Sequence, residues 1–264
     1  MKKLFFFDID GTLLQCEEGI DSIPNETRDI LDRLQKQGDD VFLATGRCKC
    51  FILDGVIDYP FNGLVTCNGA YVEYKNEVIY KKIIPLEALR KVHDLCVENH
   101  FAYYFEGNQF IYILNRTNPR HKEFQEKWIM KEEVLVDEFD LSKIETYIGM
   151  IVVNKEEDVD NMISELSCYF DVQRHQKGLS FDLTLKGESK AKGIRKLVKA
   201  LEYNMEQTVA FGDGRNDVEM LQEVGLGIAM GNAADVTKKA AKYITDNVDK
   251  NGILKALEHF SFLS

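Results

Sequence analysis

The sequence predicts an α/β protein built on a doubly wound parallel sheet, into which a second, α+β module is inserted. Three observations lead to this fold class. Both ends of the chain alternate short apolar runs with amphipathic helical stretches, the pattern of parallel strands joined by helices. The middle instead shows strands that neighbour a hairpin turn. With 264 residues the chain is long enough for two domains. We expect a sheet domain at 1–81 and 188–264, and an inserted module at 82–187.

The first third contains three expected strands and one expected helix. Residues 4–7 are a continuous apolar run, as in a strand buried on both faces. Residues 25–37 suit a helix, for which Asn25 is the expected N-cap and Gly38 the residue after its end. Residues 41–44 and 64–67 are two further apolar runs, expected as strands. The buried face of the helix is expected to hold Thr27, Ile30, Leu31 and Leu34.

The last third repeats this alternation. An apolar stripe predicts a helix, a strand is expected at 208–211, and Val218 and Leu221 indicate a second helix. A further strand is expected at 226–230. The stripe of the first helix consists of Ala191, Ile194, Leu197, Val198 and Leu201.

The middle of the chain differs. Residues 103–106 and 110–114 flank Gly107-Asn108, which favours a hairpin. A strand is expected at 147–153, a helix at 156–168, and short strands near Phe170 and Phe181. This order is typical of an α+β module.

Composition excludes several classes of protein. The formal net charge of −11 argues against non-specific nucleic-acid binding, which depends on clustered Lys and Arg. No apolar stretch approaches the ~20 residues that span a bilayer. The apolar start is cut off by Asp8 and Asp10, which argues against a signal peptide. The six cysteines lack paired CxxC spacing, so we expect reduced thiols, no zinc site and a cytoplasmic location.

Polar residues follow several of the expected strands. Asp8 and Asp10 come directly after the first strand, and ligands of parallel sheets bind at the carboxyl ends of strands. Two carboxylates there can act as nucleophile and as general acid and base. The alternative is that both cap a loop. Thr45 and Gly46 follow the second strand, where a hydroxyl and backbone N–H groups could hold phosphate oxygens, although Thr-Gly is also ordinary turn chemistry.

Two further segments carry charge. Lys190 stands at the start of a helix, where a cation is unfavourable, as expected for a charge that serves function. The alternative is an exposed lysine, which would tolerate this position at little cost. Asp213 follows the strand at 208–211, with Asn216 and Asp217 one helical turn later. Grouped oxygen ligands of this kind suit Mg²⁺. Simple helix capping by Asp213 or Asn216 is the alternative.

These segments, in this order, resemble the haloacid dehalogenase-like phosphatases, in particular the Cof-type branch, whose α/β cap is inserted between the second and third motifs. The resemblance runs over the whole chain and implies a Rossmann-like core. Lys192 lies close to the lysine motif as well, and Lys190 is the favoured residue because it precedes the apolar stripe. The matching segments are DIDGT at Asp8, ATGR at Ala44, CNGA at Cys67, Lys190, GDGRND at Gly212 and AMGNA at Ala229.

The resemblance implies a Mg²⁺-dependent phosphatase that hydrolyses small-molecule phosphate monoesters, with sugar phosphates the commonest substrates. Asp8 would be the nucleophile that becomes phosphorylated, and Asp10 the general acid and base. The resemblance implies that phosphate oxygens are bound by Thr45, Gly46, Lys190 and Asn216. It implies that the metal is bound by the Asp8 carboxylate, the backbone carbonyl of Asp10, Asp213 and the substrate phosphate, with waters positioned by Asp217.

Three other functions stay open at this point. A phosphomutase would return the phosphoryl group to a second hydroxyl. A receiver-like signalling module is disfavoured by the large insert, and a binding protein without turnover lacks direct support. The oligomeric state is not predicted. Side chains of the insert that could contact a substrate, but that more often pack or face solvent, are Tyr103, Tyr104, Tyr112, Arg116, His121, Arg174 and His175.

Overall fold

The computed structural model describes residues 2–121, 125, 130–175 and 178–263. The chain divides into two compact units. The core unit comprises Met1–Gly46, Ile52–Tyr80 and Ser189–Ser264, and the inserted unit comprises Arg47–Phe51 and Lys81–Glu188. The short segment Arg47–Phe51, which lies within the expected sheet domain at 1–81, thus groups with the insert.

The core unit is built on an eight-stranded sheet with the order β14-β13-β12-β1-β2-β3-β4-β5. The first six strands of this order, from β14 to β3, pair with their neighbours in parallel. Strand β4 pairs with β3 in the antiparallel direction. The strands are β1 (Leu4–Phe7), β2 (Asp40–Ala44), β3 (Gly63–Thr66), β4 (Tyr71–Tyr74), β5 (Glu77–Lys81), β12 (Thr208–Gly212), β13 (Leu226–Ala229) and β14 (Tyr243–Ile244). The helices are α1 (Asn25–Lys36), α2 (Asp54–Ile57), α6 (Lys190–Ala200), α7 (Val218–Glu223), α8 (Asp235–Ala240) and α9 (Gly252–His259).

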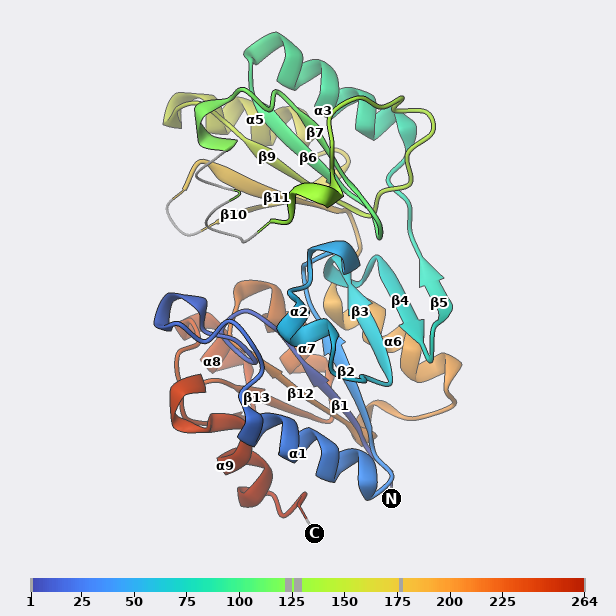
Figure 1. Cartoon of the computed structure of the whole chain (residues 1–264), viewed down its shortest axis with the longest axis vertical. Helices are drawn as coiled ribbons and strands as arrows, with labels where there is room; N and C mark the ends of the chain where they lie inside the picture. The colour runs from blue at the N-terminus through green and yellow to red at the C-terminus, as the bar shows by residue number, and fades with distance from the viewer. Residues whose placement is uncertain (1, 122–124, 126–129, 176–177, 264) are drawn as a thin grey trace. The chain divides into compact units, whose positions relative to one another are not determined.

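Helices cover both faces of this sheet (Figure 1). Side chains alternate along β1, so that Phe5 and Phe7 pack with α1 and α9 on one face. Leu4 and Phe6 pack with α6 and α7 on the other. Because both faces are buried, each central strand must be apolar throughout, which explains the uninterrupted hydrophobic run at residues 4–7.

The inserted unit has a six-stranded sheet with the order β10-β11-β9-β6-β7-β8, which is antiparallel except for the β7–β8 pair. Its strands are β6 (Ala102–Glu106), β7 (Ile111–Leu114), β8 (Leu135–Val136), β9 (Ile148–Val152), β10 (Phe170–Arg174) and β11 (Ser180–Leu185). The helices α3 (Leu86–Asn99) and α5 (Val159–Leu166) lie together on one face (Figure 1). They bury Tyr103 and Phe105 of β6 against their own apolar sides.

The predicted α/β fold class is confirmed, with one local correction. The helix predicted at 25–37 is α1, and its predicted inner face is buried. Asn25, however, is the first residue of the helix rather than its N-cap. Pro24 occupies the cap position, and its fixed φ of −55° leads the chain into the helix without a capping side chain. Gly38 follows the end of α1 with φ +99°, as its predicted role requires.

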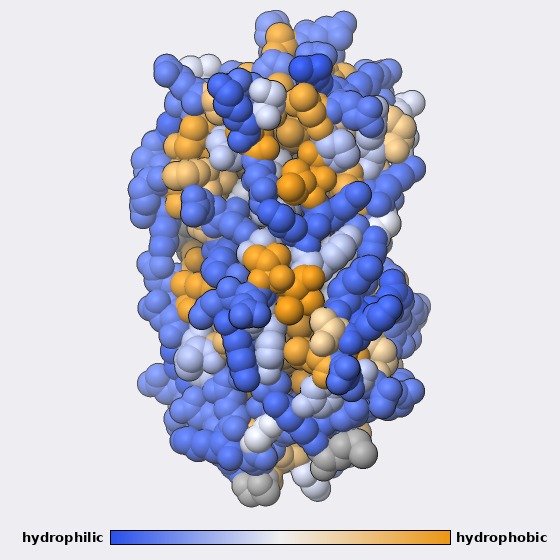
Figure 2. Space-filling view, turned by 90° about the vertical axis from the view of Figure 1, so that its right-hand side faces the viewer, coloured by the Kyte–Doolittle hydropathy of each residue, from blue (hydrophilic) through white to orange (hydrophobic). Residues whose placement is uncertain are grey.

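Hydrophilic residues cover much of the surface in Figure 2. Figure 2 shows a face dominated by hydrophilic residues, with hydrophobic groups between them. Among the described residues, no helix combines the length and the apolar composition that crossing a membrane requires.

Candidate active site

The central strands of the core unit bring Asp8 and Asp213 together. Strand β1 lies between β2 and β12, so the chain leaves β1 on one side and returns on the other. This reversal is the topological switch point at which parallel sheets bind ligands. Asp8 follows β1 and Asp213 follows β12, and the N–H of Asp8 donates to the carbonyl oxygen of Phe211 at 3.1 Å. The sheet therefore places both carboxylates at the same edge.

Lys190 is the buried cation of this edge. Its side chain is fully buried, and Nζ donates to Asp8 Oδ1 and to Asp217 Oδ1, each at 2.7 Å. Lys190 begins α6, whose N-cap Ser189 accepts a hydrogen bond from the backbone N–H of Lys192. A buried ammonium at a helix N-terminus is unfavourable unless carboxylates compensate it. The two short ion pairs supply that compensation.

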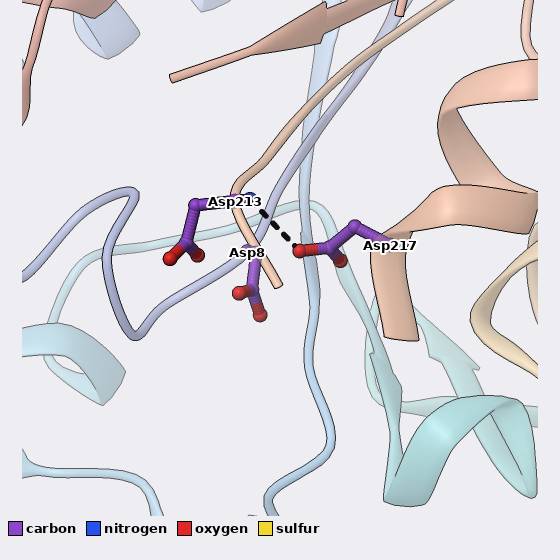
Figure 3. A group of neighbouring side chains, drawn as sticks. All are labelled: Asp8, Asp213 and Asp217. Carbon is purple, nitrogen blue, oxygen red and sulfur yellow. Dashed lines mark hydrogen bonds between the residues drawn. The ribbon is translucent and has the colours of Figure 1, made fainter. Parts of the chain in front are cut away.

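Asp217 uses both carboxylate oxygens within the protein. Besides the bond from Lys190, its Oδ2 accepts the backbone N–H groups of Asp213 and Gly214, each at 2.9 Å. Figure 3 shows Asp8 and Asp213 side by side, with Asp217 reaching the loop from the turn that precedes α7. Asp217 therefore fixes the loop that carries Asp213. The N-cap of the helical turn Arg215–Asp217 is Gly214 and that of α7 is Asp217, so neither Asp213 nor Asn216, the alternative raised from the sequence, is a cap.

The crowding of carboxylates perturbs their ionisation. Burial, and then repulsion from Asp217, raises the pKa of Asp8 to about 7, although Lys190 opposes the change. Burial, and then repulsion from Asp8, raises the pKa of Asp213 to about 8. Burial alone would lower the pKa of Lys190, but the carboxylates of Asp217 and Asp8 outweigh it, so the ammonium stays charged. One lysine is thus too little positive charge for this cluster.

The cluster fits a divalent cation. Asp8, Asp213 and Asp217 each offer a carboxylate oxygen, and these atoms lie within 4.8 Å of one another. Asp213 Oδ1 is buried and accepts no hydrogen bond from any described residue. An unsatisfied buried carboxylate oxygen is costly, and a cation would satisfy it. Carboxylate oxygens are the donors that Mg²⁺ and similar hard cations prefer.

Gly11 lets the loop after β1 pass close to Asp213. It adopts φ +79°, and a Cβ there would lie 2.1 Å from Asp213 Oδ2. The carbonyl oxygen of Gly11 accepts a hydrogen bond from Asn232 Nδ2 at 2.7 Å. Asp10, the residue before it, is half-buried, and its charge contributes to the raised pKa values of Asp8 and Asp213. Asp10 therefore lies close to the cluster.

A second group of polar residues follows β2 and β3. Thr45 is buried, and its carbonyl oxygen accepts the N–H of Asn68 at 3.2 Å. Asn216 Nδ2 donates to Asn68 Oδ1 at 3.1 Å. A Cβ on Gly46 would lie 3.1 Å from Asn68 Oδ1 and 3.4 Å from Asn216 Nδ2, so the backbone at Gly46 borders both amides. Hydroxyl, amide and backbone donors of this kind suit phosphate oxygens.

Comparison with known proteins identifies the family. The model of the haloacid dehalogenase-like hydrolases matches residues 5–257. This chain belongs to the haloacid dehalogenase-like hydrolases. The protein YkrA of Bacillus subtilis (strain 168), which carries a provisional phosphatase name, is 32% identical, and the alignment covers 99% of this chain and 98% of YkrA. The 5-amino-6-(5-phospho-D-ribitylamino)uracil phosphatase YcsE of the same organism is 27% identical, over 98% of this chain and 95% of its own.

Solved structures agree with this membership. A HAD subclass IIB sugar phosphatase, BT4131, superposes with a TM-score of 0.85 at 31% identity, covering 98% of this chain and 99% of its own. The resemblance read from the motifs is confirmed, and so is the prediction of a phosphatase-type hydrolase. Hydrolases of this family that act as phosphatases generally use a divalent metal, in keeping with the acidic cluster.

Three residues of this hydrolase have contacts at the site that the sequence did not predict: Gly11, Asn68 and Asn232. Asn68 and Asn232 lie in motifs that the resemblance quoted, but nothing in the sequence showed which atoms they contact. Gly11 stands in DIDGT, where a turn glycine is ordinary. The signal that could have found all three is their position in the segments that follow β1, β3 and β13.

The candidate substrate residues of the inserted unit are mostly engaged within it. Tyr104 and His121 are buried, and the hydroxyl of Tyr104 lies 2.6 Å from His121 Nδ1. Tyr103 is buried against the helices, and Tyr112 packs at the edge of the same core. The charged members pair with neighbours: Arg116 with Asp137, Arg174 with Glu156, and His175 with Asp182.

Proposed function

We propose that this protein hydrolyses phosphate monoesters of small molecules in a Mg²⁺-dependent reaction through an aspartyl-phosphate on Asp8. Sugar phosphates are the proposed substrate class. The observation that carries the proposal is the buried group of Asp8, Asp213 and Asp217 held by Lys190. A cytoplasmic location belongs to the proposal, and the six cysteines are all free thiols.

Asp8 is the proposed nucleophile. Its position at the end of β1 presents the carboxylate at the switch point of the sheet. One oxygen, Oδ1, accepts the bond from Lys190. The lysine favours the ionised carboxylate, which is the form able to attack phosphorus.

Lys190, Thr45, Gly46 and Asn216 are the proposed phosphate-binding residues. Attack by a carboxylate on a phosphate dianion brings like charges together, so compensation is essential. At an effective dielectric of 20, two unit charges ~4 Å apart interact by ~4 kcal/mol. Lys190 supplies a full positive charge, and Thr45, Gly46 and Asn216 supply neutral donors for the transferring oxygens.

The Mg²⁺ site is proposed at the carboxylates of Asp8 and Asp213, together with Asp10. Both oxygens of Asp217 already accept hydrogen bonds, so we assign Asp217 to holding the Asp213 loop and to orienting water. A bound ion would neutralise charge on the substrate phosphate. Asp217 restrains the loop that carries Asp213, and Gly11 allows the chain after β1 to approach Asp213 closely, so these residues would hold the site in place.

Asp10 is the proposed general acid and base. It follows Asp8 by two residues and lies close enough to add to the raised pKa values of the cluster. Asp10 would give a proton to the leaving alkoxide and later take one from the attacking water.

The substrate class is inferred from relatives. BT4131 is a sugar phosphatase that superposes over nearly the whole chain, whereas YcsE acts on a phosphorylated ribitylaminouracil. We keep the second unit as the proposed cap that sets specificity. A phosphomutase on the same scaffold is the alternative, since the first half of the reaction would be identical.

A panel of phosphate esters tests the proposal. Sugar phosphates, nucleotides and cofactor phosphates are each incubated with enzyme in Mg²⁺ or in EDTA, and free phosphate is measured. Release that occurs only with Mg²⁺, and fastest from sugar phosphates, supports the proposal. Isomerised product that depends on a bisphosphate, with little free phosphate, would replace it with the mutase.

A further inference from the structure

Cys48 and Cys50 lie next to each other in a short turn that groups with the inserted unit. Their sulfur atoms are 3.5 Å apart. The turn is closed by the N–H of Phe51, which donates to the carbonyl oxygen of Cys48 at 3.0 Å. Arg47 also holds this turn. Its Nη1 donates to the carbonyl oxygen of Phe51 at 3.0 Å, and its guanidinium lies 4.7 Å from the centre of the Phe51 ring.

The two thiols have different surroundings. Cys48 is fully buried and donates a hydrogen bond to the carboxyl group of Glu106. Cys50 is half-buried, and its thiol donates to the carbonyl oxygen of Gly107 at 3.4 Å. Cys50 is thus the thiol that a small oxidant can reach, and Cys48 is held beside it. The reaction proposed for phosphate esters uses neither group.

Separation of the sulfur atoms is compatible with a disulfide. An S–S bond is ~2.05 Å long, so the sulfur atoms need to approach by about 1.5 Å. Rotation about χ1 of one or both residues can supply a movement of that size. Cys96 differs: burial raises the pKa of its thiol well above the ordinary value, which disfavours the reactive thiolate.

We propose that Cys48 and Cys50 form a redox site, in which a hydroperoxide oxidises Cys50 and the product is a reversible disulfide. In the first step the Cys50 sulfur attacks the peroxide, the O–O bond breaks, and Cys50 sulfenic acid and water (or an alcohol) form. In the second step the Cys48 sulfur attacks the Cys50 sulfur, the S–O bond breaks, and a second water leaves. Two thiols lose two electrons and the peroxide gains them.

Oxidation alters the chain beside the proposed phosphate site. Closing the disulfide breaks the bonds from Cys48 to Glu106 and from Cys50 to Gly107. Cys48 is two residues from Gly46 in the chain, so the backbone after Thr45 shifts with it. This consequence rests on the function proposed above, in which Thr45 and Gly46 bind phosphate. A misplacement of ~1 Å can lower a rate by up to ~100-fold, so we expect a fall of about tenfold or more.

The experiment uses the full chain with the two exposed cysteines, Cys16 and Cys168, replaced by serine. Reduced protein is treated with hydrogen peroxide and digested with trypsin. Trypsin cleaves after Lys49, so a Cys48–Cys50 disulfide holds two peptides together that otherwise separate. The matched control carries Cys50→Ser in addition. Phosphate release with Mg²⁺ is measured on the same samples before and after dithiothreitol.

We expect linked peptides, two hydrogens lighter than the reduced pair, that separate after dithiothreitol, together with a reversible loss of phosphate release. The Cys50→Ser control should keep its activity in peroxide. Separate thiols or sulfinic acids at Cys48 and Cys50 would overturn the proposal, and so would a disulfide that leaves turnover unchanged. The mass measurement needs no turnover, so it decides the disulfide even where the proposed phosphatase activity fails.

Discussion

Replacing Lys190 with methionine removes the buried cation of the site while keeping the length of the side chain. The substitution deletes two hydrogen bonds of 2.7 Å, to Asp8 and to Asp217. At an effective dielectric of 20, a unit positive charge ~4 Å from a unit negative charge contributes ~4 kcal/mol, so about 3 kcal/mol of lost charge compensation is a conservative figure. Because ~1.4 kcal/mol corresponds to tenfold in rate, we expect kcat/KM to fall by at least ~100-fold.

The loss has two physical sources. Without Lys190 the carboxylates of Asp8, Asp213 and Asp217 repel one another more strongly, which favours a proton on Asp8 and removes the nucleophile. Under the proposed mechanism, the substrate phosphate would also lose the ammonium assigned to bind it. Steady-state phosphate release with saturating Mg²⁺ measures the effect, and circular dichroism checks that the variant is folded.

Lys192→Met is the matched control. Lys192 lies in the same first turn of α6 and is half-buried, and its bond to Ser189 comes from the backbone N–H, which the substitution keeps. We expect its kcat/KM to stay within about threefold of the wild-type value, as for substitutions away from the reacting groups. A folded Lys190→Met variant with nearly full activity, or a large loss in Lys192→Met alone, would refute the assignment of Lys190.

Three further predictions follow. Asp10→Asn should slow hydrolysis of the phosphoenzyme by ~100-fold or more, as expected for loss of a general base, and unchanged single-turnover rates would contradict this. Gly11→Ala should lower the free energy of unfolding by about 1–3 kcal/mol and weaken activation by Mg²⁺, because the added Cβ would meet Asp213. Urea unfolding measures the first effect and a Mg²⁺ titration of activity the second. Wild-type values in both would count against this prediction. Burial, and then repulsion from the charge of Asp182, raises the pKa of Glu106 to about 8. The folded state therefore binds the carboxyl proton of Glu106 more tightly than the unfolded state does. Stability from Glu106 is therefore present below its ordinary pKa of 4.5 and is lost as pH rises to about 8. Between pH 5 and 8, the free energy of unfolding of Glu106→Gln, measured in urea, should rise relative to that of the wild type by about 1–4 kcal/mol. A difference that does not change with pH would argue against this prediction.

Motifs at strand ends made the core and much of the candidate site predictable. The apolar run at 4–7 predicted a strand buried on both faces, and the end of that strand predicted the place of Asp8. The spacing of Asp213 and Asp217 put both acids in one turn. The sequence also favoured Lys190 over Lys192, and the structure brings the Lys190 ammonium to Asp8 and Asp217.

Other features depend on contacts between distant parts of the chain. That Asn68 meets Asn216 follows from the order β12-β1-β2-β3, which local periodicity does not contain. The cap of α1 was misassigned because Asn and Pro are both favourable near a helix start, and only backbone angles separate them. The grouping of Arg47–Phe51 with the insert likewise rests on contacts to Glu106 and Gly107, over fifty residues away in the chain.

The most direct test of the central claim is phosphate release by Asp8→Asn on the best substrate of the panel, with saturating Mg²⁺. The control is Asp21→Asn, an exposed aspartate in the same part of the chain. The account predicts no release above background from Asp8→Asn and wild-type release from the control. Substantial Mg²⁺-dependent release by pure Asp8→Asn would contradict it.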